Sequence, residues 1–136
     1  MRILAYIVTF FLLVSCSSKA TTYTLETNYY FFEHDDLSIT GFEEYLNYLT
    51  PDDWDFMILT PSRPIKGSNF IQVGAPSERR DLNLSIEINI ANPKKIEMYR
   101  YYTKSREEVL RILADYFEKQ EIPDYKNWED VSDEMN

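Results

Sequence analysis

Aliphatic and polar residues alternate strictly between residues 82 and 90. Aliphatic residues occupy every second position and polar residues stand between them, in the order Leu82, Asn83, Leu84, Ser85, Ile86, Glu87, Ile88, Asn89 and Ile90. Successive side chains of a strand point to opposite faces, so this pattern predicts a strand with one aliphatic face and one polar face. Asn92 and Pro93 predict a turn, and residues 96–103 predict an antiparallel partner strand.

Three further strands and two helices are predicted around this pair. Residues 22–32, 55–60 and 69–73 are rich in β-branched and aromatic side chains, which favour strands. Two segments match the capping box that begins a helix, namely Thr40-Gly41-Phe42-Glu43 and Ser105-Arg106-Glu107-Glu108. Apolar residues three or four apart predict that the helices run from these boxes toward Pro51 and Pro123.

The resulting order is β-α-β-β-β-β-α, which lacks the βαβ rhythm of a parallel sheet. We therefore expect an α+β fold in which about five strands form a mostly antiparallel sheet, with two helices packed on one face. The other face should be polar. Trp128, in the acidic tail, is expected to dock on the domain.

The N-terminal segment has the layout of an export signal. Arg2 is followed by an uncharged apolar run over residues 3–14, whose helix would rise only ~18 Å against a hydrocarbon layer of ~30 Å. A charged start, a short apolar core and small residues at the end are typical of a secretory signal peptide. The alternatives are an ordinary signal peptide with an incidental cysteine and an N-terminal transmembrane anchor.

Leu13-Val14-Ser15-Cys16 resembles the lipobox of bacterial lipoproteins. The resemblance implies that Cys16 is diacylated and becomes the first residue after cleavage. It predicts a signal peptide at 1–15, a lipidated tether at 16–22 and a single α+β domain at 23–136. Ser17 replaces the aspartate associated with inner-membrane retention, so the outer membrane facing the periplasm is expected. A surface position or a Gram-positive host is the alternative.

Charge narrows the choice of partner. The chain has 23 Asp and Glu against 14 Lys and Arg, a formal net charge of −9. Nucleic acid is disfavoured because phosphate binding needs a basic face. A basic protein is the natural partner for such a surface, although acidity can also serve solubility alone.

Two groups of residues are candidates for contact with a protein partner. The first is the acidic set Asp52, Asp53 and Asp55. The second is Glu97, Tyr99 and Tyr101, which share one face of their strand and, if that face also carries Glu87, form an acidic platform with two tyrosines. The alternative is that these rings cover the sheet or meet another element.

Catalytic chemistry is not predicted. His34 is the single histidine, and the acidic residues around it lack the spacing of a calcium loop. Acids beside Trp54 and Trp128 could serve glycoside hydrolysis, yet they equally describe a tryptophan docked on a solvated edge. The single cysteine excludes an intramolecular disulfide and a cysteine-based metal site. We expect no enzyme activity, no metal and no cofactor.

A small, acidic, lipid-anchored α+β domain resembles the lipoprotein immunity proteins that accompany secreted antibacterial toxins. The resemblance lies in general organisation and not in a motif. It implies a protein that binds a periplasm-acting toxin and occludes its active site. The alternative function is an envelope scaffold or assembly lipoprotein, and a cell-wall glycosidase is a weaker third.

Overall fold

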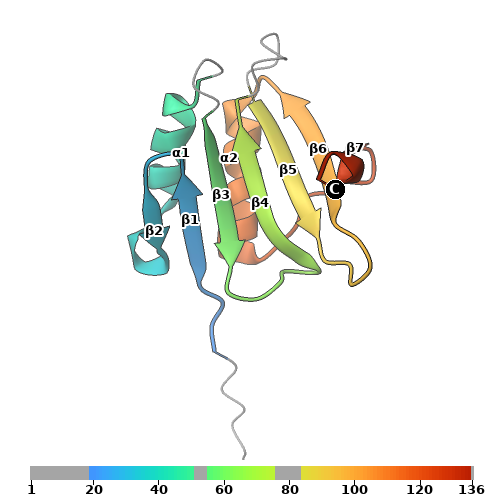
Figure 1. Ribbon diagram of the computed structural model, residues 1–136. Helices are drawn as coiled ribbons and strands as arrows, with labels where there is room; N and C mark the ends of the chain where they lie inside the picture. Colours follow the sequence, from blue (N-terminus) through green and yellow to red (C-terminus); the bar gives the residue numbers. More distant parts are fainter. Residues whose placement is uncertain (1–18, 51–54, 76–83, 136) are drawn as a thin grey trace, which may run out of the picture.

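The computed structural model describes residues 19–50, 55–75 and 84–135. Within these residues, seven strands form one antiparallel sheet, and two α-helices cover one of its faces (Figure 1). The elements are β1 Tyr23–Thr27, β2 Phe31–Glu33, α1 Ile39–Tyr48, β3 Phe56–Pro61, β4 Ser68–Gly74, β5 Leu84–Ile90, β6 Glu97–Thr103, α2 Arg106–Ala114 and β7 Glu129–Asp130. Their order in the sheet is β2-β1-β3-β4-β5-β6-β7. The predicted α+β class is confirmed, with seven strands in place of about five.

The additional strands come from the two ends of the described chain. The run predicted as one strand over residues 22–32 folds back on itself, so that Thr24 of β1 pairs with Glu33 of β2. The Thr27 hydroxyl accepts a hydrogen bond from the Tyr30 backbone N at 3.0 Å and stabilises this turn. At the other edge, β7 pairs Asp130 with Tyr99 of β6. No Gly or Pro marks the turn directly before β2 or β7, so the sequence did not predict these two short strands.

Both helices begin at serine caps. The Ser105 side chain accepts from the Glu108 backbone N at 3.1 Å and begins α2 as predicted. The first helix begins earlier than predicted, because Ser38, and not Thr40, is its cap and accepts from the Gly41 backbone N at 3.0 Å. After α2 the chain makes a π-helical turn over Asp115–Lys119.

The core lies between the sheet and the two helices. The sheet contributes a cross-strand row of buried aliphatic residues, Leu25, Leu59, Ile71 and Ile88. The helices contribute the buried residues Phe42 and Leu46 from α1 and Val109 and Leu113 from α2. At roughly 1.5–3 kcal/mol for each fully buried large side chain, this layer is the main source of stability.

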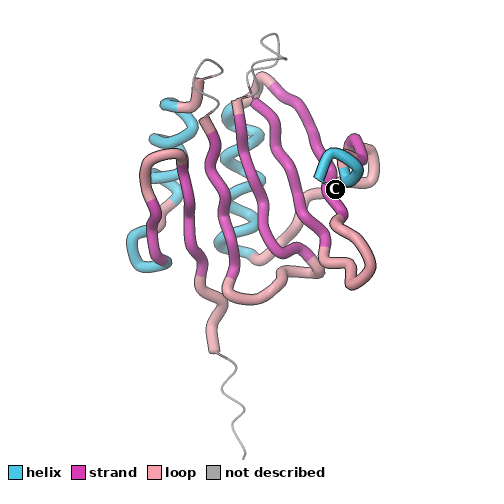
Figure 2. Tube along the Cα trace, viewed as in Figure 1, coloured by secondary structure: helices cyan, strands magenta, loops and turns pink. Residues whose placement is uncertain are grey.

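The expected solvated polar face of β5 is absent. Glu87, Asn89 and Ser85 are only 7–8% exposed. The short C-terminal helix η5, Ser132–Met135, lies near them on the side of the sheet opposite α1 and α2 (Figure 2). Its Glu134 pairs with Arg100 of β6 at 2.9 Å.

The register of β5 and β6 also corrects the predicted acidic platform. Ile88 lies opposite Tyr99 and Ile86 opposite Tyr101, whereas Glu87 lies opposite Arg100. The two tyrosines therefore share the aliphatic, helix-covered face, and Glu87 points to the other side. Alternation defines the two faces of each strand, but the length of the connecting turn decides which faces coincide.

No helix within the described residues is long and apolar enough to cross a membrane. The predicted signal peptide and Cys16 lie outside the described residues. Thr21, in the predicted tether, is buried and accepts a hydrogen bond from Arg63 Nε at 3.0 Å. The chain thus contacts the domain before β1 begins.

Candidate protein-binding cleft

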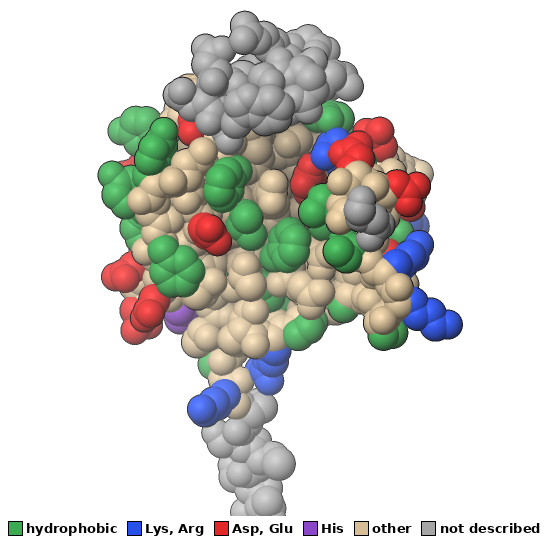
Figure 3. All heavy atoms as spheres, viewed as in Figure 1, with side chains coloured by type: hydrophobic (Ala, Val, Ile, Leu, Met, Phe, Trp, Pro, Cys, Tyr) green, Lys and Arg blue, Asp and Glu red, His purple; other side chains and the backbone are tan. Residues whose placement is uncertain are grey.

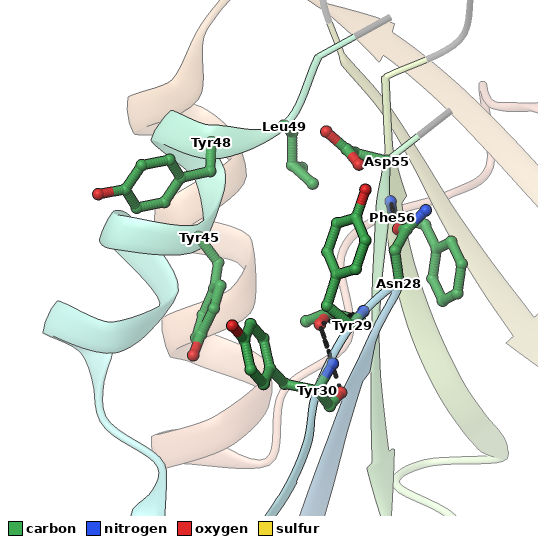
Figure 4. A pocket seen from close by; sticks show the side chains of 9 residues that line it. Asn28, Tyr29, Tyr30, Tyr45, Tyr48, Leu49, Asp55 and Phe56 are labelled. Atoms are coloured by element: carbon green, nitrogen blue, oxygen red, sulfur yellow. Dashed lines mark hydrogen bonds between the residues drawn. The ribbon is translucent and has the colours of Figure 1, made fainter. Parts of the chain in front are cut away.

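A cleft lined mainly by tyrosines lies between α1 and the end of the sheet where β1 turns into β2 (Figure 4). Its volume is about 420 Å³. The principal walls are Tyr29 and Tyr30 from the β1–β2 turn, Tyr45 and Tyr48 from α1, and Asp55 and Phe56 at the start of β3. The cleft thus depends on three segments that are separate in the sequence.

The turn wall is held by hydrogen bonds on both sides. The Thr27 backbone N donates to the Tyr30 carbonyl oxygen at 2.9 Å, which closes the turn. Asn28 Oδ1 accepts from the Phe56 backbone N at 2.7 Å and ties the turn to β3. Tyr29 and Tyr30 are therefore presented by a fixed backbone.

The rings form a continuous series of aromatic contacts. Tyr29 lies 6.5 Å from Tyr30, Tyr30 lies 6.0 Å from Phe32, and Phe32 lies 5.3 Å from Tyr45, measured between ring centroids. Tyr48 follows Tyr45 by three positions, which places it on the same side of α1. Ring pairs of this kind are stabilising beyond the area that they bury, so they hold the rings of the turn against α1.

These rings are unusually exposed for aromatic side chains. Tyr29 is 75% exposed, Tyr30 61% and Tyr48 76%. Burial, with smaller contributions from the neighbouring Tyr30 and Glu44, raises the pKa of Tyr45 above its ordinary value. Like any tyrosine at neutral pH, Tyr45 keeps its hydroxyl proton and can donate a hydrogen bond to a ligand.

Asp55 is the predicted partner-binding residue that the structure places in the cleft. It is 9% exposed, and its Oδ2 accepts from the Thr50 backbone N at 3.0 Å and from the Thr50 hydroxyl at 3.3 Å. Figure 4 shows its carboxylate at one end of the cleft, with the Tyr29 ring extending toward it. Asp52 and Asp53, predicted to act with Asp55, lie outside the described residues.

The structure does not bring the other predicted residues to the cleft. Glu87 is buried and its Oε1 accepts from Arg100 Nε at 2.6 Å. Glu97 accepts from Asn92 Nδ2 at 2.6 Å. Tyr99 packs on Tyr125, with ring centroids 4.8 Å apart. A role for these residues in partner binding stays a prediction.

A second hollow, of about 510 Å³, lies between α2 and the segment that leads to β7. Tyr101 lines it and stacks on Trp128 with 5.6 Å between ring centroids, so Trp128 docks as predicted. Two of its four acidic residues have cationic neighbours: Asp115 lies 2.7 Å from Lys119 Nζ, and Glu121 pairs with Lys66. Its described lining includes one tyrosine, Tyr101, against four in the first cleft.

The tyrosine cleft continues onto the face of the sheet that the helices leave open. Phe31, Ile58 and Phe70 lie on strand positions adjacent to core-facing residues and therefore point to this open face. Phe31 is 62% exposed, and the other two are partly exposed. Figure 3 shows hydrophobic side chains gathered there. In the sheet register Glu26 lies between Phe31 and Ile58, so polar side chains separate the exposed apolar ones on this face.

The excess negative charge of the protein lies in residues 20–62, which contain the cleft and which we call the cleft-bearing unit. Between Ala20 and Ser62 the sequence has nine acidic residues (Asp or Glu) and no Lys or Arg. The rest of the chain has fourteen acidic and fourteen basic residues, so its charges cancel. This stretch forms β1, β2, α1 and β3 and therefore carries the whole formal charge of −9. On the left edge of Figure 3, near β2, acidic side chains appear without basic ones.

Ion pairing follows the same division. Among the described residues, the ion pairs join residues between Lys66 and Glu134, and the carboxylates of the cleft-bearing unit pair with no Lys or Arg. Arg106 does reach this unit, but it donates to the carbonyl oxygens of Leu46 and Leu49 at 3.2 and 3.5 Å. The uneven charge was visible in the sequence and would have located the cleft-bearing unit.

No cluster of three or more His, Cys, Asp or Glu that could hold a metal occurs within residues 19–50, 55–75 and 84–135. No family model, curated protein or solved structure matches the chain.

Proposed function

We propose that this protein is a lipid-anchored envelope protein that binds and neutralises a basic protein, as an immunity protein does with a periplasm-acting toxin. The observation that carries the proposal is the position of the exposed tyrosines. Three of them, each 61–76% exposed, surround a cleft on the unit that holds the entire excess of negative charge. Tyrosine is enriched at interface hot spots because it combines a large apolar ring with a polar end.

The charge and the rings have complementary roles in this proposal. Uncompensated carboxylates attract a basic protein from a distance and speed its encounter with the correct face. The tyrosine rings, Phe56 and the apolar residues of the open sheet face then supply short-range contact. Charge thus favours rate and orientation, and the rings favour affinity.

The position of the cleft suits a protein held at a membrane. The chain enters the domain at one end of β1, and the cleft lies at the opposite end, beside the β1–β2 turn (Figure 1). The five residues of β1 span roughly 17 Å at about 3.3 Å per residue. An acylated Cys16 would hold the entry end near the bilayer, and the cleft would face the soluble compartment.

The lining favours recognition over catalysis. His34 lies outside the cleft, where its ring stacks on Tyr23 and its Nδ1 accepts from the Tyr23 backbone N at 3.3 Å. Asp55, the carboxylate of the described lining, is bonded to Thr50. These residues provide rings, hydroxyls and fixed charge, which serve to bind a surface.

The test is genetic. Deletion of this gene should arrest growth of its bacterial host when a toxin is encoded beside it, and deletion of both genes should restore growth. The wild-type gene should complement the single deletion, and a Tyr29→Ala/Tyr48→Ala variant should complement it poorly. Normal growth of the single deletion strain at a locus without a toxin gene would favour the scaffold or assembly alternative.

A further inference from the structure

We propose that the tyrosine cleft is a receptor for an arginine side chain that projects from the partner. The guanidinium would stack on the tyrosine rings and face the Asp55 carboxylate. This inference rests on the proposed function, since it assumes a basic protein partner, and it specifies the chemical group by which that partner is recognised.

The walls and the end of the cleft match a planar cation. Tyr29, Tyr30 and Tyr48 line the cleft, and cations are attracted to the faces of aromatic rings. A guanidinium is planar and more weakly hydrated than an ammonium, so it stacks on rings and loses less hydration on entering a cleft. The geometry therefore favours arginine over lysine.

The acidic end of the cleft can accept donors from such a group. Among the described residues, both hydrogen bonds to the Asp55 side chain end on Oδ2, which leaves Oδ1 able to accept. Among the described residues that line the cleft there is neither a lysine nor an arginine. An entering guanidinium would thus meet a carboxylate that is 9% exposed and is not neutralised by the described Lys and Arg side chains.

The same combination occurs inside this protein with the arginine present. The Arg100 guanidinium carbon lies 5.8 Å from the centre of the Tyr102 ring, and Arg100 Nε donates to Glu87 at 2.6 Å. There a tyrosine and two carboxylates, the buried Glu87 and the exposed Glu134, hold one guanidinium. The cleft repeats the tyrosine and the carboxylate, and the partner would contribute the arginine.

The experiment compares two peptides of equal charge. Dye-labelled hexa-arginine and hexa-lysine are titrated into the full-length protein in a neutral detergent, and binding is followed by fluorescence anisotropy. We expect hexa-arginine to bind about two- to fivefold more tightly, because an exposed cation–π contact changes affinity by about this factor and arginine makes it more readily than lysine. Equal affinity for the two peptides would overturn the inference.

Matched variants separate stacking from charge. Tyr29→Ala/Tyr48→Ala should abolish the preference for arginine, while Tyr125→Ala, at a tyrosine outside the cleft, should keep it. Glu43→Gln/Glu44→Gln on α1 should weaken both peptides more than Glu107→Gln/Glu118→Gln, an equal charge change at exposed residues beyond the cleft-bearing unit. Retention of the preference in the double tyrosine variant would contradict the proposed site. Circular dichroism melting confirms that each variant is folded, and Tyr48→Ala alone, at a 76% exposed residue, provides a milder version of the tyrosine test.

The two proposals fail in different ways. An absent arginine preference together with toxin-dependent growth arrest of the deletion strain rejects the arginine receptor and retains the immunity function. An arginine preference without any growth phenotype retains the receptor and rejects immunity as its use.

Discussion

Removal of the Arg100 side chain should expose how the polar side of the sheet is stabilised. Arg100 Nε donates to Glu87 at 2.6 Å, and Nη2 donates to Glu134 at 2.9 Å. The Glu87 side chain is 11% exposed and that of Glu134 is 55% exposed. Burial lowers the pKa of Arg100, but its hydrogen bonds to both carboxylates outweigh that effect and raise the pKa above its ordinary value.

Arg100→Met leaves the Glu87 carboxylate buried without its cation. Removal of one partner of a buried ion pair costs about 3–5 kcal/mol. Loss of the exposed Glu134 contact accounts for at most about 1 kcal/mol of that. We therefore expect the free energy of unfolding to fall by about 3 kcal/mol or more in Arg100→Met and by less than about 1 kcal/mol in Glu134→Gln.

Urea unfolding followed by far-ultraviolet circular dichroism measures both changes. The double variant Glu87→Leu/Arg100→Met removes the charge together with its partner, so it should recover most of the lost stability. The reasoning is refuted if Arg100→Met is as mild as Glu134→Gln, or if the double variant is no more stable than Arg100→Met alone.

Three further predictions address the core and the anchor. The buried Tyr116 hydroxyl lies 3.0 Å from Ser68 Oγ, and burial raises the pKa of Tyr116 to about 12. Since the folded state favours the protonated phenol, Tyr116 contributes about 3 kcal/mol to the free energy of unfolding below pH 10, and this contribution is lost between pH 10 and about 12. Tyr116→Phe should remove this alkaline step from the pH dependence of urea unfolding. Ile88→Asp should unfold the domain, because Ile88 is 0% exposed and an unpaired charge would enter the core; an unchanged thermal melting curve would disprove this. Cys16→Ala should abolish incorporation of radioactive palmitate, and a wild-type protein that takes up no label would overturn the lipobox assignment.

Local patterns in the sequence predicted most elements of the fold. The alternation through Ile86 and Ile88 gave a strand, and the box at Ser105 gave the start of α2. The register between paired strands was harder to predict, because it depends on the position and length of the turns that connect them. The connection that places Ile88 opposite Tyr99 leaves no mark in the alternation of either strand, so the sequence left open which face of β5 the tyrosines share. The alternative that these rings meet another element is confirmed by Tyr125 and Trp128.

The cleft could not be predicted from short-range patterns. Tyr29 and Tyr30 lie in a run that reads as continuous strand, and the turn between β1 and β2 is held by Thr27 and Asn28 instead of the usual Gly or Pro. Tyr48 reaches the same cleft from a helix. The absence of Lys and Arg from Ala20 to Ser62 is a longer-range signal that was present in the sequence.

Site-specific photocrosslinking in living cells tests the central claim most directly, because it reports both the partner and the surface that it contacts. A photoreactive benzoylphenylalanine is introduced at Tyr48, inside the cleft, and in a separate strain at Tyr125, outside it. The account predicts a crosslink to one protein of net positive charge from position 48 and none from position 125. Equal crosslinking of that protein from both positions, or a partner of net negative charge at position 48, would contradict it.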